Sequence, residues 1–378
     1  QQQQQQQRLT AAEAATMITT VGPLRDLAFD WEHAGDRFMG KPAYETKLLW
    51  EHEHEEKTPT VLKPLASQLR RLWEERGKGG MPKEVEGELE IPRRPNKYPL
   101  SRIVLIRNHH QDQKFLHSFC LNERRRHEGG APFNPKIDEQ HEERQAVLDQ
   151  LKGQMITNDT LPDFSYSSAL LAFHGSSHGR VESICNGGLA SVDVGKDRES
   201  FFGNGHYLTT VPEYAAKYAV PAGVGEGERK PNAKGEYVVM AHYVNPMRCY
   251  AITRSKDYPK RGNVVGPTSE ESRSYLHSSD GPGLIAKYGG TYRTIEARGF
   301  DTAYAIVSDE VSGQAVNLMR FTGGETARQG GHQREAQWDE IVLKESSQAC
   351  VAALFYFKQP GTDCGDCGSN SSSAIDAG

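Results

Sequence analysis

The sequence lacks any long apolar run. No stretch approaches the ~20 consecutive apolar residues that a membrane-spanning helix requires, and no signal peptide is visible. We therefore expect no membrane partner. Positive charge is not in excess either, since 45 Lys and Arg stand against 50 Asp and Glu, for a net charge of −5. A nucleic-acid partner is therefore not indicated, although a local basic patch would still permit one.

Cysteine is scarce as well. Only Cys364 and Cys367 of the six cysteines lie close together, as Cys-Gly-Asp-Cys. A structural zinc ion would need two further ligands at a fitting spacing, and none follow, so we predict no metal site. Residues 51–56 (EHEHEE) include ligand types, but consecutive helical residues point in all directions, and we interpret this run as a solvated helix end. Reduced thiols are the rule in the cytoplasm and nucleus, where we expect the protein.

Composition divides the 378 residues into five segments. Residues 1–9 are a glutamine-rich tail, and residues 10–80 carry apolar side chains at three- and four-residue steps, which predicts a helical N-terminal region. Residues 81–99 hold four prolines and are interpreted as a linker. Residues 100–359 are rich in short strands with hairpin-length links, which predicts an antiparallel α+β domain. Residues 360–378 form a Ser- and Gly-rich tail that we expect to be disordered.

Periodicity and turn residues place the elements of this domain. Strands are expected at 103–106, 169–173, 237–244, 301–307, 315–321, 339–343 and 349–357, and helices at 108–123, 139–155, 180–185 and 212–218. The helix at 139–155 should bury Val147 and Leu151. Residues 254–298 are polar and dotted with glycine, and we interpret them as an insertion.

The stretch from 169 to 218 has the residue pattern of a functional cleft. An apolar run of strand length ends in His174 and Gly175, which is how a buried strand presents a reactive side chain and bare backbone at the edge of a cleft. Further on, Phe-Phe-Gly-Asn-Gly-His-Tyr-Leu brings Tyr207 out of a glycine-rich turn. A helix that begins near Pro212 then carries Tyr218.

This order of motifs resembles the catalytic core of the poly(ADP-ribose) polymerase (PARP) family of ADP-ribosyltransferases. The resemblance covers roughly residues 100–357 and implies an antiparallel split β-sheet ADP-ribosyltransferase fold, preceded by the helical region. It also implies an enzyme that moves ADP-ribose, as one unit or as a chain, from NAD to an acceptor, usually a protein side chain, and releases nicotinamide. NAD is then the donor substrate, and no metal is required.

The resemblance implies roles for individual residues. His174 matches the histidine that hydrogen-bonds the adenosine-side ribose of NAD, and Gly175 matches the glycine whose backbone N–H and C=O grip the carboxamide. Ser176 follows where Ser or Thr is usual. Tyr207 matches the tyrosine of the His-Tyr-Glu triad, which lines the nicotinamide pocket. Tyr218 matches a second tyrosine that stacks on the nicotinamide ring.

The third triad member should be a glutamate that begins a late strand, several residues before a glutamine. Glu340, followed by Gln348, fits this pattern, whereas Asp339 and Glu345 compete with it. Asp339 should point to the opposite face of the strand, because successive strand side chains alternate. A carboxylate is needed because cleavage of the bond between nicotinamide and ribose develops positive charge on the sugar, which a preorganised negative charge stabilises.

Two further positions bear on NAD. Arg198 lies where the family has the donor loop that covers the adenosine and pyrophosphate, and its charge suits a phosphate contact. Ala215 stands where the family usually has a serine that bonds the carboxamide, which removes a hydrogen bond worth about 1 kcal/mol. This departure leaves a second hypothesis open, a catalytically degenerate module that binds NAD without transferring ADP-ribose.

Other readings of the sequence are less well supported. An interaction protein whose biology lies in helices of residues 10–80 is a third hypothesis. A Ser-His hydrolase lacks the Gly-x-Ser-x-Gly turn that would surround its nucleophile, and the arginine-rich site of the NAD-dependent RNA 2′-phosphotransferase is not matched. We assign no role to His178, His206 and His332, which we expect on the surface or in loops.

Overall fold

The computed structural model describes residues 44–75, 83–85, 88–90, 96–127, 141–154, 156–157, 168–190, 205–221, 229–252, 300–309, 316–318 and 338–360. The predictions for the N-terminal tail, for Arg198, for the insertion at 254–298 and for Cys364 and Cys367 fall outside these residues.

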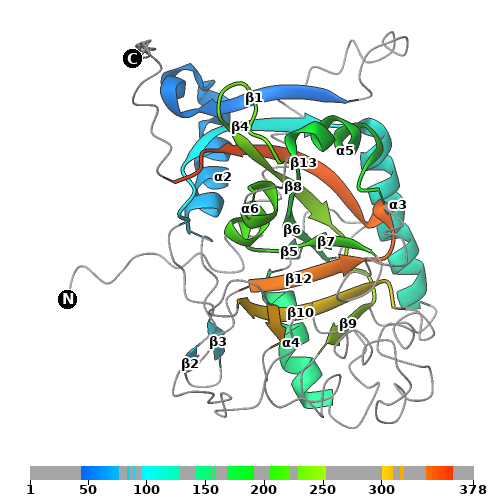
Figure 1. Ribbon diagram of the computed structural model, residues 1–378. Coiled ribbons are helices and arrows are strands. Elements are labelled where there is room, and N and C mark those ends of the chain that lie inside the picture. The colour runs from blue at the N-terminus through cyan, green and yellow to red at the C-terminus, as the bar shows by residue number, and fades with distance from the viewer. Residues whose placement is uncertain are drawn as a thin grey trace, which may run out of the picture.

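The described chain contains helices and strands in a mixed order (Figure 1). The strands are β1 (Glu45–Glu51), β2 (Lys83–Val85), β3 (Glu88–Glu90), β4 (Leu100–Arg107), β5 (Ile156–Thr157), β6 (Ser168–Gly175), β7 (His206–Leu208), β8 (Tyr237–Val244), β9 (Cys249–Ile252), β10 (Thr302–Asp309), β11 (Val316–Leu318), β12 (Trp338–Leu343) and β13 (Ala349–Phe357). The α-helices are α2 (Lys63–Glu75), α3 (His109–His127), α4 (His141–Gln154), α5 (Val181–Gly187) and α6 (Pro212–Ala219), and the 3₁₀ helices are η2 (His52–Lys57), η3 (Thr60–Leu62), η5 (His178–Arg180) and η6 (Ser346–Gln348).

Two antiparallel sheets form the framework of the molecule. The first has the strand order β1-β4-β13-β8-β6-β5, and the second has the order β11-β10-β12-β7, with β9 parallel to β10. The second sheet lies below the first in Figure 1. The two meet where Phe173 in β6 bridges Thr209, just after β7, through two backbone hydrogen bonds of 2.7 and 3.0 Å. The α+β class with antiparallel sheets that the sequence predicted is therefore confirmed.

The central strands of the first sheet are buried on both faces, which explains their apolar sequences. Every residue of β8 and of β13 is buried. Alternate residues of β13 enter different cores, because strand side chains alternate between faces. Phe355 stacks on Trp73 of α2 at 5.6 Å between ring centroids, in a core that also receives α6. Leu354 faces the opposite core, which contains Val181 of α5.

Helix α4 packs beside the second sheet. It buries Val147 and Leu151, as the sequence predicted, in a core that includes residues of both sheets. Arg144 on the same helix is also buried. Its guanidinium lies 4.5 Å from the centre of the Tyr250 ring and donates a hydrogen bond to the Ala251 carbonyl. A charged side chain is tolerated there because a ring face and a carbonyl oxygen replace its water.

The expectation of helix throughout residues 10–80 is wrong for residues 45–51. This segment is strand β1, which pairs antiparallel with β4. The pairing register shifts between Leu48 and Trp50, so the consecutive residues Leu49 and Trp50 are both buried while Leu48 is half exposed. A bulge of this kind breaks the alternation that marks a strand, and the remaining pattern imitates a helix. Glu51 of the EHEHEE run ends strand β1, whereas residues 52–56 belong to the 3₁₀ helix η2, which has no buried residue. The solvated character expected of the run is therefore confirmed for residues 52–56.

The predicted linker at 81–99 does not separate two cores. Trp73 of α2 donates a hydrogen bond to the Tyr98 carbonyl at 2.8 Å and contacts the rings of Phe355 and Phe357 in β13. Within the described chain, residues 44–75 and the strands beyond residue 100 therefore share one hydrophobic core. Part of the linker itself forms the short hairpin β2–β3. Pro-rich composition indicated a boundary, but the aromatic contacts that cross it were not visible in the sequence.

Candidate functional site

His174 lies near the end of β6, beside the point where the two sheets meet. Its Nδ1 is 2.8 Å from the carbonyl oxygen of Tyr207 in β7. Because a carbonyl oxygen only accepts, Nδ1 carries the hydrogen, and Nε2 of the neutral ring is left as an acceptor. Burial lowers the pKa of His174, the hydrogen bond to the Tyr207 carbonyl opposes this, and the charge of Arg180 lowers the pKa slightly further. The ring is therefore neutral at neutral pH.

Gly175 follows at a position that no other residue could occupy. A Cβ placed there would lie 1.8 Å from the carbonyl oxygen of Ala215, because helix α6 crosses directly over it. Among the described residues, pairing between β6 and β7 is limited to the Phe173–Thr209 bridge. In a strand, the N–H and C=O of residues two apart point to the same edge. The backbone groups of Gly175 therefore point, like those of Phe173, to the edge where the two sheets separate.

Tyr207 and Glu340 lie on one face of the second sheet. Tyr207 in β7 is paired with Val342 in β12, and side chains of paired residues project to the same face. Glu340 is two residues from Val342 and shares that face, as does Trp338. Tyr207 packs against the apolar cluster that contains Val342 and Trp338. The register alone thus brings the predicted tyrosine and acid together, from positions far apart in the sequence.

The Glu340 carboxylate is buried and hydrogen-bonded. Only 7% of the residue is exposed, and the hydroxyl of Tyr214 on α6 donates to Oε1 at 2.5 Å. Burial raises the pKa of Glu340 to about 7, the nearby charge of Asp339 also raises it, and the Tyr214 hydrogen bond opposes the rise. A carboxylate with such a pKa exchanges its proton at neutral pH, which is typical of catalytic acids and bases.

Asp339 faces the other way, as the alternation of strand side chains predicted. Its two oxygens accept hydrogen bonds from both the Oγ1 and the backbone N–H of Thr210, from Oγ1 of Thr209 and from the Tyr304 hydroxyl. The residue is buried and its acceptor capacity is filled. Asp339 therefore fixes the segment after β7 and has no room to act on a ligand.

Glu345 and Gln348 also make hydrogen bonds that stabilise the local structure. Glu345 is exposed, and its side chain caps the 3₁₀ helix η6 in a capping box with Gln348. Gln348 is fully buried and donates to the Asn245 carbonyl and to Oγ1 of Thr302. Of the three acids that compete for the third position of the triad, Glu340 is the one that shares a face with Tyr207.

Tyr218 lies at the exposed end of a hydrogen-bond chain that leads to Glu340. Its hydroxyl donates to the hydroxyl of Tyr214 at 2.9 Å, and the two rings meet edge to face at 5.3 Å. Tyr218 is 43% exposed, so part of the residue is accessible. Ser176, beside Gly175, is buried. Tyr214 was not predicted from the sequence, although its spacing of four from Tyr218 places both on one side of the helix.

Two buried histidines near His174 were also missed. His206 was expected on the surface or in a loop, but it is 5% exposed in β7. His242, in the apolar strand β8, is fully buried and its ring meets the His174 ring edge to face at 6.3 Å. Burial lowers the pKa of both histidines, for His242 to about 3. Among the described residues, no group of His, Cys, Asp or Glu is arranged to hold a metal ion.

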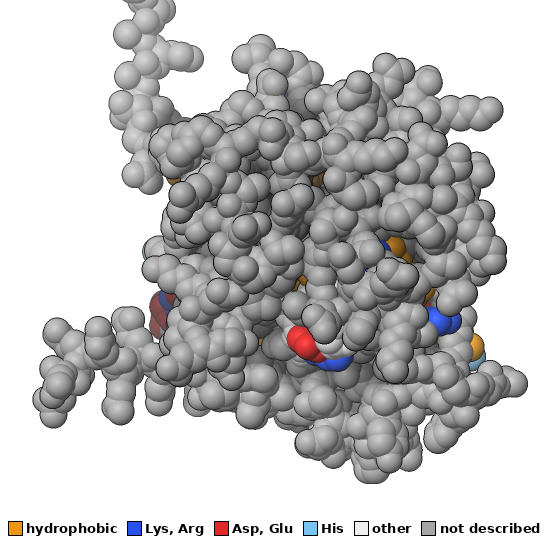
Figure 2. All heavy atoms as spheres, turned by 90° about the horizontal axis from the view of Figure 1, so that it is seen from below, with side chains coloured by type: hydrophobic (Ala, Val, Ile, Leu, Met, Phe, Trp, Pro, Cys, Tyr) orange, Lys and Arg blue, Asp and Glu red, His pale blue; other side chains and the backbone are white. Residues whose placement is uncertain are grey.

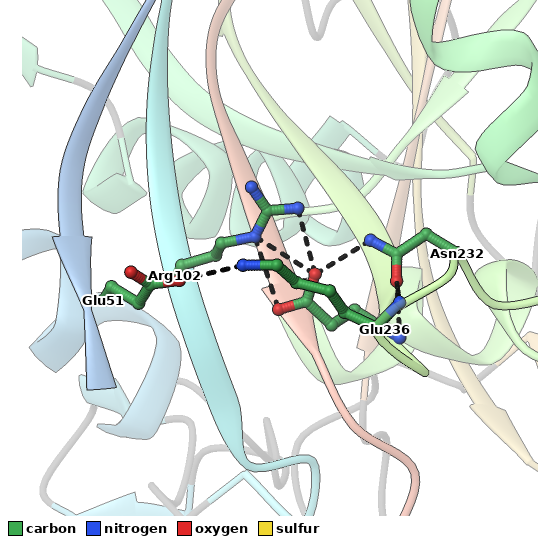
Figure 3. A network of polar contacts seen from close by, with 5 residues as sticks. Glu51, Arg102, Asn232 and Glu236 are labelled. Carbon is green, nitrogen blue, oxygen red and sulfur yellow. Dashed lines mark hydrogen bonds and ion pairs between the residues drawn. The ribbon is translucent and has the colours of Figure 1, made fainter. Parts of the chain in front are cut away.

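A separate cavity of about 630 Å³ lies between η5, α5 and the β1–β4–β13 edge of the first sheet. Arg102 and Lys234 line it, and neither His174, Tyr207, Tyr218 nor Glu340 does. Figure 3 shows the ion pairs beside it. Arg102 binds the buried carboxylate of Glu236 through Nε and Nη2, with a shortest distance of 2.9 Å. Lys234 pairs with Glu51 at 3.2 Å, so both cations are neutralised by the protein itself.

The described surface charges are mixed in sign. On α4, Lys152 pairs with Asp149 at 3.0 Å. On the face at the bottom of Figure 1, the acidic and basic side chains that the structure describes lie next to one another (Figure 2). This arrangement agrees with a net charge of −5 and gives that face no basic stripe among its described residues.

Together these features define an α+β protein in which two antiparallel sheets meet beside a His, a Tyr and a buried Glu. The sequence matches no model of a known protein family, and a search of curated proteins gave no match. In the part of the chain that the structure describes, no helix is long and apolar enough to cross a membrane.

Proposed function

We propose that the protein is an NAD-dependent ADP-ribosyltransferase of the PARP-like His-Tyr-Glu type, with the split-sheet fold of that family. It would transfer ADP-ribose from NAD to protein side chains and release nicotinamide. The main support is the convergence of three strands. His174 of β6 is hydrogen-bonded to the backbone of Tyr207 in β7, and Tyr207 shares a face with Glu340 of β12.

The buried Glu340 carboxylate suits the chemistry of this transfer. Cleavage of the bond between nicotinamide and ribose gives the sugar the character of an oxocarbenium ion, and a fixed negative charge in a site without water stabilises that charge strongly. The ionised form of Glu340 is required. Since its pKa is about 7, the active fraction rises with pH through neutrality.

The other predicted residues suit the binding of NAD. Nε2 of His174 is an acceptor for a ribose hydroxyl, because Nδ1 is occupied by the Tyr207 carbonyl. The backbone N–H and C=O of Gly175 would bind an amide, which offers one acceptor and one donor in return. Tyr218 is partly exposed, and an aromatic ring suits stacking on a flat heteroaromatic ring.

Release of nicotinamide and transfer of labelled ADP-ribose test this proposal directly. We would compare the wild type with Glu340→Gln and with Glu345→Gln, using NAD labelled in the nicotinamide ring for release and in the adenine for transfer to protein. Glu340→Gln should lower both rates by about 100-fold or more, as loss of transition-state charge stabilisation does. Glu345→Gln should keep both rates, because this exposed acid only caps η6. Retained release in Glu340→Gln would show that the acid was misassigned.

A module that binds NAD without transfer is the second candidate. It is favoured by Ala215, whose buried methyl group stands where the related enzymes usually have a serine hydroxyl. Calorimetric titration of the same samples with NAD separates the two candidates. Binding without release of nicotinamide above background would support the module, and binding with release would support the enzyme. Absence of both would remove NAD from the function.

A further inference from the structure

A chain of two hydroxyl groups connects the protein surface to the buried acid. The Tyr218 hydroxyl donates to the Tyr214 hydroxyl at 2.9 Å, and the Tyr214 hydroxyl donates to Oε1 of Glu340 at 2.5 Å. Tyr214 is 2% exposed and Glu340 is 7% exposed. A hydrogen bond to a carboxylate in such surroundings is strong, because little water competes for it.

Trp338 holds the Tyr214 ring in place. The two rings stack at 5.0 Å between centroids with an angle of 11° between their planes. Trp338 belongs to β12 and lies two residues before Glu340 on the same face. The Nζ of Lys217, also on α6, lies 3.6 Å from the centre of the Trp338 ring. Packing therefore fixes the phenol hydroxyl against the carboxylate rather than leaving it to rotate among several partners.

We propose that Tyr214 is the positioning residue for Glu340 and that Tyr218, through Tyr214, connects the ligand-facing surface to this acid. The inference rests on the proposed function, because it assigns Glu340 the role of the reacting carboxylate. The Tyr214 hydroxyl holds one carboxylate oxygen at a fixed place and favours the ionised form. A ligand stacked on Tyr218 would then be coupled to the orientation of the Glu340 carboxylate through these two hydrogen bonds.

The surroundings of Glu340 show which groups decide its protonation. Apart from burial, Tyr214 favours ionisation most, Asp339 on the same strand as Glu340 opposes it, and Tyr218 favours it to a smaller degree. Helix α6 adds Lys217 over the Trp338 ring and Tyr218 at the end of the chain, and β7 adds Tyr207 on the same face. From β10, the residue paired with Glu340 is Ala305, which carries no charge. Loss of the Tyr214 hydroxyl should therefore raise the pKa of Glu340.

The test is a pH titration of the Glu340 carboxyl by isotope-edited infrared spectroscopy of ¹³C-labelled glutamate, assigned by difference from Glu340→Gln. Tyr214→Phe should move the midpoint of this titration upward by about one to two pH units, the range expected for a hydrogen bond to a charged group. Tyr304→Phe is the matched control, since Tyr304 makes the same phenol-to-carboxylate bond to Asp339 on the opposite face. It should leave the midpoint unchanged. An unchanged midpoint in Tyr214→Phe would overturn the proposal.

The titration reads the carboxyl itself, so it decides the proposal even if no NAD is consumed. If Tyr214→Phe shows the shift but the wild type releases no nicotinamide, the proposed function alone is refuted. If the wild type is active, Tyr214→Phe should lower kcat about tenfold or more with little change in KM, and the acid limb of its pH profile should move with the carboxyl midpoint. If Tyr214→Phe does not fold, Tyr218→Phe replaces it, because this residue is largely accessible. In Tyr218→Phe, an upward shift of the Glu340 midpoint that is smaller than the one expected for Tyr214→Phe would support the proposal. An unchanged midpoint would overturn it.

Discussion

Replacement of Glu340 by Gln should make the stability of the protein less dependent on pH. The pKa of Glu340 rises from 4.5 to about 7 on folding, mainly because burial disfavours the charged form. Below pH 4.5 the carboxyl is neutral in both states and does not affect stability. Between pH 4.5 and 7 the unfolded chain releases this proton and the folded chain keeps it, so stability falls as pH rises. Above pH 7 the loss is constant.

The size of the effect follows from the shift. About 2.5 pH units at about 1.4 kcal/mol each give about 3 kcal/mol of destabilisation in the wild type at pH 8, relative to pH 4. Glu340→Gln removes the titrating group but keeps an oxygen that accepts from the Tyr214 hydroxyl. The free energy of unfolding of the variant minus that of the wild type should therefore be about 3 kcal/mol larger at pH 8 than at pH 4, whatever constant offset separates the two proteins.

Urea denaturation of both proteins at half-unit steps from pH 4 to pH 8.5 measures this difference. The two free energies of unfolding should diverge from pH 4.5 to 7 and run parallel on either side, with similar m-values. Other titrating groups cancel, because the two proteins share them. Curves that remain parallel across the whole range would refute the argument, since they would mean that the Glu340 carboxyl has the same proton affinity in both states.

Two further substitutions test the packing around the site and beside the cavity. Gly175→Ala should destabilise the protein by about 3 kcal/mol or prevent folding, because the new Cβ meets the Ala215 carbonyl. The control Gly179→Ala should change the melting temperature little, because the space around Gly179 is open. Arg102→Ala should cost about 3 kcal/mol in a denaturation experiment, because it leaves the buried carboxylate of Glu236 without its cation. A loss below 1 kcal/mol for Arg102→Ala would mean that water reaches that carboxylate.

Much of the fold was predictable because its signals are local. The strand that carries His174 near its end, the helix that begins at Pro212 and the orientation of Asp339 each follow from periodicity within a few residues. The same periodicity failed at Leu49, where a bulge buries two consecutive side chains. A bulge is fixed by the partner strand, 55 residues or so further along, and no rule on neighbouring residues contains it.

The contacts around the candidate site were less predictable from the sequence than the site residues themselves. The resemblance selected Glu340, but its hydrogen bond to Tyr214 spans 126 residues and depends on how α6 packs on β12. His242 stood in an apolar strand with no flanking motif, and only the pairing of β8 with β6 brings it beside His174. Such contacts depend on how distant strands and helices pack together, which local patterns in a single sequence do not reveal.

The packing of α2 and β1 against the main sheet limits how the protein can be trimmed. A shortened chain that starts at residue 100 would leave β4 as a bare edge and expose the rings of Phe355 and Phe357 that Trp73 covers. Such a fragment should aggregate, so its failure to bind a partner would not show that the deleted residues recruit partners. Any deletion meant to ask whether the first 80 residues recruit partners must therefore stop before Tyr44, where the described structure begins.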